Sequence, residues 1–132
     1  MKKELKSKFE ELGVIVVYLF GSKATGRQSR LSDSDIGVVL KEALPGSDTR
    51  SLYHNLYNLF ASIYPTSRLD IVFLQEAPLA LQYSAITEGK ILFEKDPQLT
   101  VDYENYVINQ YLDFRYILDY FDEVTRERYA EA

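Results

Sequence analysis

VIVVYLFGSKATGRQSRLSDSDIGVVL, residues 14–40, is the stretch that decides the fold. Its first seven residues, Val14–Phe20, are apolar or aromatic and end at Gly21, which predicts a buried strand followed by a turn. Residues 35–40 repeat this pattern after a polar segment and predict a second buried strand. We therefore expect two core strands joined by a polar connection that is available for chemistry.

The length and composition favour one globular domain spanning residues 1–132. The chain has no cysteine, which excludes disulfides, zinc–thiolate sites and thiol catalysis. Its formal charge of -5 gives no basic surface for a long nucleic acid, so we expect no direct nucleic-acid substrate. There is no signal-peptide pattern and no apolar run near the roughly 18 residues of a membrane span. We expect a soluble, cytoplasmic protein without a membrane partner.

The rest of the sequence alternates helical and strand patterns. Helices are predicted over residues 2–12, 22–28, 78–89 and 99–127, and between Asp48 and Pro65; strands are predicted over residues 68–74 and 91–93. This alternation predicts an α/β (α+β) domain with a small mixed sheet flanked by helices. Residues 1–96 would form the core, and residues 97–132 a long C-terminal helix.

Three aspartates are candidate metal ligands. Asp33 and Asp35 are two positions apart in an extended segment, so their side chains should share one face. Asp70 is the single acid in an otherwise apolar strand, a poor choice for a purely structural role. If the third strand lies beside the second, the three carboxylates meet and suit Mg²⁺. The alternative is that Asp33 and Asp35 belong to a solvated loop or a helix cap and that Asp70 is a strand-edge acid paired with Arg68 or a lysine.

The connection after the first strand is a candidate phosphate site. Glycine at Gly21 allows close backbone approach, and the amides and hydroxyl of Ser22 can bind phosphate oxygens at a strand-to-helix junction. A lone Gly-Ser is more often a simple turn, so the case depends on all of these features occurring together and in order.

These residues resemble the minimal nucleotidyltransferases of the DNA-polymerase-β-like superfamily. Gly21-Ser22, ten further residues and then Asp33-Ser34-Asp35 match the motif of that family. Further similarity lies in residues 69–74, 77–79, 85–86, 89–96 and 111–114, so it covers nearly the whole chain. The sequence departs from the family at Thr25, where a second basic residue is usual, and at Arg30, where proline is common.

The resemblance implies a polymerase-β-like fold and transfer of a nucleoside monophosphate to a hydroxyl, with ATP as co-substrate. It implies two Mg²⁺ ions held by Asp33, Asp35 and Asp70, with Asp70 also helping to deprotonate the acceptor. Two metals suit an in-line displacement without a side-chain nucleophile. Gly21 and Ser22 would bind the β- and γ-phosphates, and Lys23 is a further candidate nucleotide contact.

The acceptor must come from elsewhere, because the chain has no second domain to hold one. Six of the 11 tyrosines lie on or beside the last helix. We expect the stripe Val107, Tyr111, Phe114, Leu118 and Phe121 to pack this helix on the domain. Tyrosines outside it, Tyr103, Tyr106 and Tyr116, would then face a partner, unless they too cover the helix against its own sheet.

The smallest members of the resembled family are antitoxins whose partner is a HEPN ribonuclease toxin that is modified with AMP, typically on a tyrosine. The resemblance therefore implies an antitoxin that adenylylates a HEPN partner. Two alternatives stay open: an antitoxin that neutralises its partner by binding alone, and a small-molecule nucleotidyltransferase of the aminoglycoside-modifying kind.

Overall fold

A four-stranded mixed sheet forms the centre of the computed structural model, which describes residues 3–21, 34–42, 49–64 and 69–130. The strands lie in the order β3-β2-β1-β4. β1 runs antiparallel to both β2 and β4, whereas β2 and β3 are parallel. The strand bounds are β1 Val14–Phe20, β2 Ser34–Leu40, β3 Leu69–Phe73 and β4 Lys90–Glu94. The mixed sheet expected from the sequence is confirmed.

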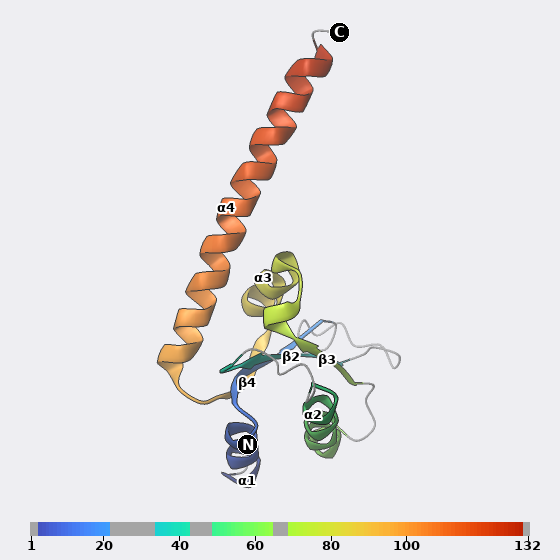
Figure 1. Cartoon of the computed structure of the whole chain (residues 1–132), viewed down its shortest axis with the longest axis vertical. Coiled ribbons are helices and arrows are strands. Elements are labelled where there is room, and N and C mark those ends of the chain that lie inside the picture. Colours follow the sequence, from blue (N-terminus) through green and yellow to red (C-terminus); the bar gives the residue numbers. More distant parts are fainter. Residues whose placement is uncertain (1–2, 22–33, 43–48, 65–68, 131–132) are drawn as a thin grey trace.

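Helices cover both faces of the sheet (Figure 1). α1 (Lys3–Glu11) and α2 (Thr49–Ile63) lie on one face, and α3 (Leu79–Glu88) and the start of α4 (Pro97–Ala130) lie on the other. Side chains alternate along a strand, so each face of the sheet builds its own core. Phe9, Leu56 and Phe60 pack on the first face, while Leu74 and Ala85 pack on the second.

β1 is buried because it lies inside the sheet with helices on both sides. Six of its seven residues are buried and Ile15 is half-buried. A register shift between Val14 and Val16 marks an irregularity at its start. A strand covered on both faces is apolar at consecutive positions, which is why it was recognisable in the sequence.

The end of β2 is completed by a side chain. β3 pairs with β2 as far as Val38, after which the chain turns into a short 3-10 helix, η1 (Leu74–Glu76). From η1 the amide of Gln75 accepts from the Leu40 N–H at 2.8 Å and donates to the Leu40 carbonyl at 2.7 Å. The side chain replaces the strand partner that β3 no longer supplies. The predicted strand over residues 68–74 therefore ends earlier than expected.

α4 is anchored at its base by polar and aromatic contacts. Tyr18 of β1 donates to Glu104 at 2.8 Å, and Tyr103 donates to Gln82 of α3 at 2.9 Å. One turn above Val107, the ring of Tyr111 stacks on Tyr83 of α3 at 4.0 Å. Tyr103, which the sequence analysis placed toward a partner, instead packs against the domain, and that expectation was wrong.

Beyond Tyr111, α4 extends away from the domain (Figure 1). Its 34 residues span about 50 Å, whereas α3, the helix it packs on, has only ten residues. Phe114, Leu118 and Phe121 are 46–59% exposed, so the expectation that the whole stripe packs on the domain was wrong. Tyr106 and Tyr116, expected outside the stripe, are exposed.

The remaining predicted helices and strands are present with bounds that differ by a few residues, except the helix expected over residues 22–28, which lies outside the described residues. Across the described ranges, none of the helices combines the length and apolar character needed to cross a membrane.

Candidate active site

Two of the three candidate acids lie side by side in the sheet. Asp35 of β2 pairs in register with Asp70 of the parallel strand β3. Their chain neighbours Ile36 and Ile71 belong to the core under α1 and α2, so Asp35 and Asp70 lie on the opposite face, the face of α3. Asp35 is half-buried and Asp70 is exposed. The two carboxylates therefore lie next to each other at the end of the sheet where β2 and β3 begin. We call this end of the sheet the carboxylate edge.

Gly21 follows the last residue of β1 and lies against Asp35 of this pair. Phe20 is the register partner of Asp35, and Gly21 follows it with a φ of 85°. A Cβ atom built on Gly21 would overlap the carboxylate oxygen Oδ2 of Asp35. Glycine is required here both by its left-handed conformation and by the proximity of Asp35. The sequence suggested a glycine that lets a phosphate approach; the structure adds a glycine that makes room for an acid.

A second glycine, which the sequence analysis did not single out, supports the same strand. Gly37 lies two residues after Asp35, and a Cβ at this position would come within 2.8 Å of Cδ1 of the buried Leu74. The absent side chain lets η1 close over β2 next to the acids. The available signal was a glycine inside an otherwise apolar strand, which often marks a close approach.

The other predicted site residues cannot be placed. Asp33, Ser22 and Lys23 lie outside the described residues, as do Thr25 and Arg30. Among the residues that are described, no three acidic or histidine side chains come together as a metal site. The roles assigned to Asp33, Asp35, Asp70, Gly21, Ser22 and Lys23 stay predictions.

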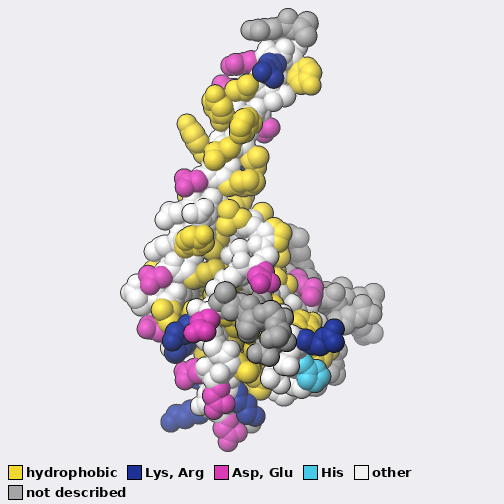
Figure 2. Space-filling view, viewed as in Figure 1, with side chains coloured by type: hydrophobic (Ala, Val, Ile, Leu, Met, Phe, Trp, Pro, Cys, Tyr) yellow, Lys and Arg dark blue, Asp and Glu magenta, His cyan; other side chains and the backbone are white. Residues whose placement is uncertain are grey.

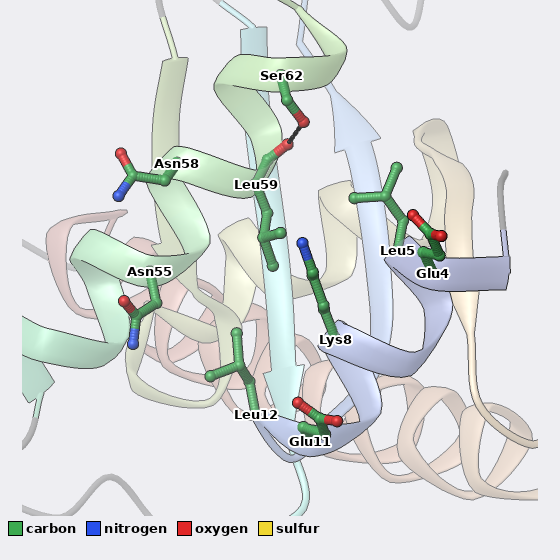
Figure 3. Close-up of a pocket in the computed structure, with 9 residues that line it drawn as sticks. All are labelled: Glu4, Leu5, Lys8, Glu11, Leu12, Asn55, Asn58, Leu59 and Ser62. Atoms are coloured by element: carbon green, nitrogen blue, oxygen red, sulfur yellow. Dashed lines mark hydrogen bonds between the residues drawn. The ribbon is translucent and has the colours of Figure 1, made fainter.

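A hollow of about 520 Å³ lies elsewhere. It is formed between α1 and α2, on the face of the sheet opposite Asp35 and Asp70 (Figure 3). Lys8 points into it between the two helices, beside the apolar Leu59, and Asn55 and Asn58 line its other side. Lys8 lies between Glu4 and Glu11 of the same helix, so the hollow has no net positive charge to select a nucleotide.

The comparison with family models identifies the fold. The model described as "Polymerase beta, Nucleotidyltransferase" matches residues 3–98. The chain belongs to this nucleotidyltransferase family. The match covers the sheet, α1 to α3 and the first residues of α4, and therefore includes the Gly21–Asp35–Asp70 edge. A search of curated proteins finds no match.

Solved structures of similar chains come from toxin–antitoxin complexes. A chain from a toxin–antitoxin crystal structure with AMP-PNP is 28% identical with a TM-score of 0.67, over 91% of this chain and 98% of that one. A chain from the MntA–HpeT complex carrying two Asp-to-Glu substitutions is 25% identical with a TM-score of 0.68, over 92% and 96%.

A third similar chain comes from the complex of a tri-AMPylated HEPN toxin of Shewanella oneidensis with an MNT antitoxin. It is 24% identical with a TM-score of 0.60, over 95% of this chain and 99% of that one. At this identity the likeness shows the fold alone. These solved chains cover 91–95% of the protein and therefore most of α4, which the family model leaves largely unmatched.

Proposed function

We propose that the protein is an antitoxin that transfers AMP from ATP to a hydroxyl group, in particular that of a tyrosine, on a partner HEPN ribonuclease toxin. The observation that carries the proposal is the register pair Asp35–Asp70 beside Gly21, in a chain of the nucleotidyltransferase family. The reaction forms a bond from the acceptor oxygen to the α-phosphorus of ATP and breaks the bond from that phosphorus to the departing pyrophosphate. The cytoplasm is the compartment that supplies ATP for it.

The acids at this edge fit divalent cations. Carboxylate oxygens are the ligands that Mg²⁺ prefers, and two adjacent carboxylates repel each other unless a cation neutralises them. Asp35 and Asp70, together with Asp33, would hold two Mg²⁺ ions. Bound there, the ions would neutralise the triphosphate and stabilise the oxygens of the displacement.

The chain's own residues would position the nucleotide and the acceptor. Gly21 and Ser22 would bind the β- and γ-phosphates through backbone amides and the hydroxyl, with Lys23 as a further contact. Asp70, the more exposed acid, would face the acceptor and help to remove the proton of its hydroxyl.

The partner is proposed from the similar complexes. One similar structure is a toxin–antitoxin with AMP-PNP, and another contains a tri-AMPylated HEPN toxin. The first supports binding of an adenine nucleotide. The second contains an AMPylated HEPN toxin, which is the product expected of the proposed reaction. We extend both to this chain as proposals, because the carboxylate edge and the long α4 are features of its own structure.

A second candidate function is neutralisation by binding alone. The exposed apolar side chains of α4 favour it, because they offer a partner surface that does not need catalysis. An Asp35→Ala variant separates the two functions when it is co-expressed with the toxin at wild-type levels. Loss of protection against the toxin supports catalytic neutralisation, whereas full protection supports binding alone.

A further inference from the structure

The distal part of α4, residues 112–130, carries apolar side chains that nothing in the described chain covers. Figure 2 shows them along the helix above the domain. The large ones are 46–78% exposed: Leu112, Phe114, Tyr116, Ile117, Leu118, Tyr120, Phe121 and Tyr129. Most of the stability of a helix in a protein comes from packing of its apolar face. This segment lacks such packing and would be stabilised by binding another surface.

The exposed stripe continues a face of α4 that is already packed. Val107 is buried against the domain, and Tyr111 stacks on Tyr83. Phe114, Leu118 and Phe121 follow Tyr111 at intervals of three, four and three residues, which keeps them on the same face of the helix. The stripe is therefore one interface, of which the domain covers only the lower part.

The angular width of the apolar stripe around α4 indicates what kind of surface it can bind. Ile117 and Val124 lie along one flank of the seam, and Tyr120 lies beyond them, so the apolar arc covers about half of the helix circumference. A second single helix would cover only the narrow seam, as in a two-stranded coiled coil. An arc of this width fits a groove between two helices.

The size of the surface and its border agree with a protein partner. Six of the eight large side chains lie on this arc, because Leu112 and Tyr116 fall outside it, and at about half exposure the six offer on the order of 600 Å², approaching one side of a standard interface. Beside the seam, on the side away from Ile117 and Val124, the helix has a polar face with both signs of charge, at Arg115, Asp119, Asp122 and Arg126. Charges of both signs around an apolar centre are typical of the solvated rim of an interface.

We propose that residues 112–130 dock into an apolar groove between two helices of the partner that the antitoxin modifies. This inference rests on the proposed function for the identity of the partner. The surface itself is separate from the acids at the start of β2 and β3, so binding and transfer can be tested independently.

The experiment measures binding to the purified HEPN ribonuclease proposed as the partner, by isothermal titration calorimetry. The variant Leu118→Gln/Phe121→Gln removes the centre of the stripe and should weaken binding at least ~100-fold. The matched control Asp119→Gln/Arg126→Gln places the same side chains on the polar face without changing the net charge, and it should bind within about threefold of wild type. Unchanged thermal unfolding of both variants shows that the exposed substitutions leave the fold intact.

Three results would overturn the docking proposal. The first is binding of the stripe variant at wild-type affinity, and the second is the absence of binding by the wild-type chain. The third is a wild-type dimer in light scattering that the stripe substitutions make monomeric, because the stripe would then be covered by a second copy of this chain. An Asp35→Asn variant separates the two proposals: normal binding without AMP transfer supports both, whereas transfer at the wild-type rate contradicts only the role proposed for Asp35 in catalysis.

Discussion

At the scale of single residues, the account depends on how closely Gly21 and Asp35 approach each other. Substitution Gly21→Ala places a Cβ against the Asp35 carboxylate and also imposes a positive φ on alanine. We expect a loss of roughly 2–4 kcal/mol in the free energy of unfolding, together with loss of nucleotidyl transfer, because Asp35 must move. Denaturant unfolding and a transfer assay measure the two effects.

Gly13→Ala is the matched control for this substitution. Gly13 has a similar φ of 79°, but a Cβ there would meet nothing within 4 Å. It should cost only about 1–2 kcal/mol, the conformational part, and leave transfer intact. Equal losses in both variants would show that the proximity of Asp35 has no importance.

Asp70→Asn tests whether the carboxylates of Asp35 and Asp70 repel each other and whether Asp70 binds Mg²⁺. Both effects are measured as changes in stability. Without a cation, removing one of two neighbouring negative charges should stabilise the protein by about 0.5 kcal/mol. Mg²⁺ should stabilise the wild-type chain and have less effect on the variant, because a metal ligand has been removed. Thermal unfolding with Mg²⁺ and with a chelator measures both effects. An equal response of the two proteins to Mg²⁺ would contradict a role for Asp70 as a metal ligand.

Buried tyrosines predict the response to alkaline pH. Burial and the hydrogen bond to Glu104 raise the pKa of Tyr18, and burial raises the pKa of Tyr103, both above the ordinary value near 10. Above that pH the unfolded chain loses protons that the folded chain keeps. The contribution of these two tyrosines to stability should therefore be constant below about pH 10 and fall as the pH rises beyond it.

Tyr18→Phe should reduce this alkaline loss of stability, although it removes a hydrogen bond at neutral pH. Urea unfolding at pH 8 and at pH 10.5 measures the free energy of unfolding of the wild type and of Tyr18→Phe. A loss between these pH values that is as large in Tyr18→Phe as in wild type would contradict the assignment to Tyr18.

At the scale of secondary-structure elements, the side chain of Gln75 takes the place of a strand. Gln75→Ala would leave the N–H and carbonyl of the buried Leu40 without these partners, which should cost about 1–3 kcal/mol. Gln98→Ala is the control, because Gln98 is exposed and its side chain bonds only within α4 in the contacts described. It should cost less than about 0.5 kcal/mol in urea unfolding. Comparable losses would contradict the role given to Gln75.

Most helices and strands were predictable because the pattern of apolar residues in the sequence agrees with which side chains are buried. β1 is apolar throughout and has both faces covered, and α1 ends at Glu11, two residues before Gly13, which adopts a positive φ. Two features were not predictable in this way. The contact of Gly37 with Leu74 joins residues that are distant in sequence, and the stripe of α4 looks the same in sequence where it packs on α3 and where it does not.

The candidate site could be predicted in part from the sequence. As the single acid in an otherwise apolar strand, Asp70 was expected to lie near Asp35 if the third strand lay beside the second, and the two strands are parallel neighbours. The contact between Gly21 and Asp35 could not be predicted, because it depends on how the end of β1 meets β2.

At the scale of the whole molecule, the structure combines a compact nucleotidyltransferase domain with a helix longer than the domain can cover. Backbone amides beyond residue 112 should exchange with solvent faster than those of residues 99–111, which pack on the domain. Adding the HEPN partner should slow exchange in the distal segment. Hydrogen–deuterium exchange mass spectrometry measures both states, and equal protection along α4 in the free chain would contradict this difference.

The central claim is transfer of AMP, and the most direct measurement follows the phosphates of ATP. The wild-type chain, its HEPN partner and Mg²⁺ are incubated in parallel with ATP labelled at the α-phosphate and with ATP labelled at the γ-phosphate. The account predicts that the α label enters the partner, that the γ label does not, and that Asp35→Asn transfers neither. Labelling from the γ position, or undiminished α labelling by Asp35→Asn, would contradict it.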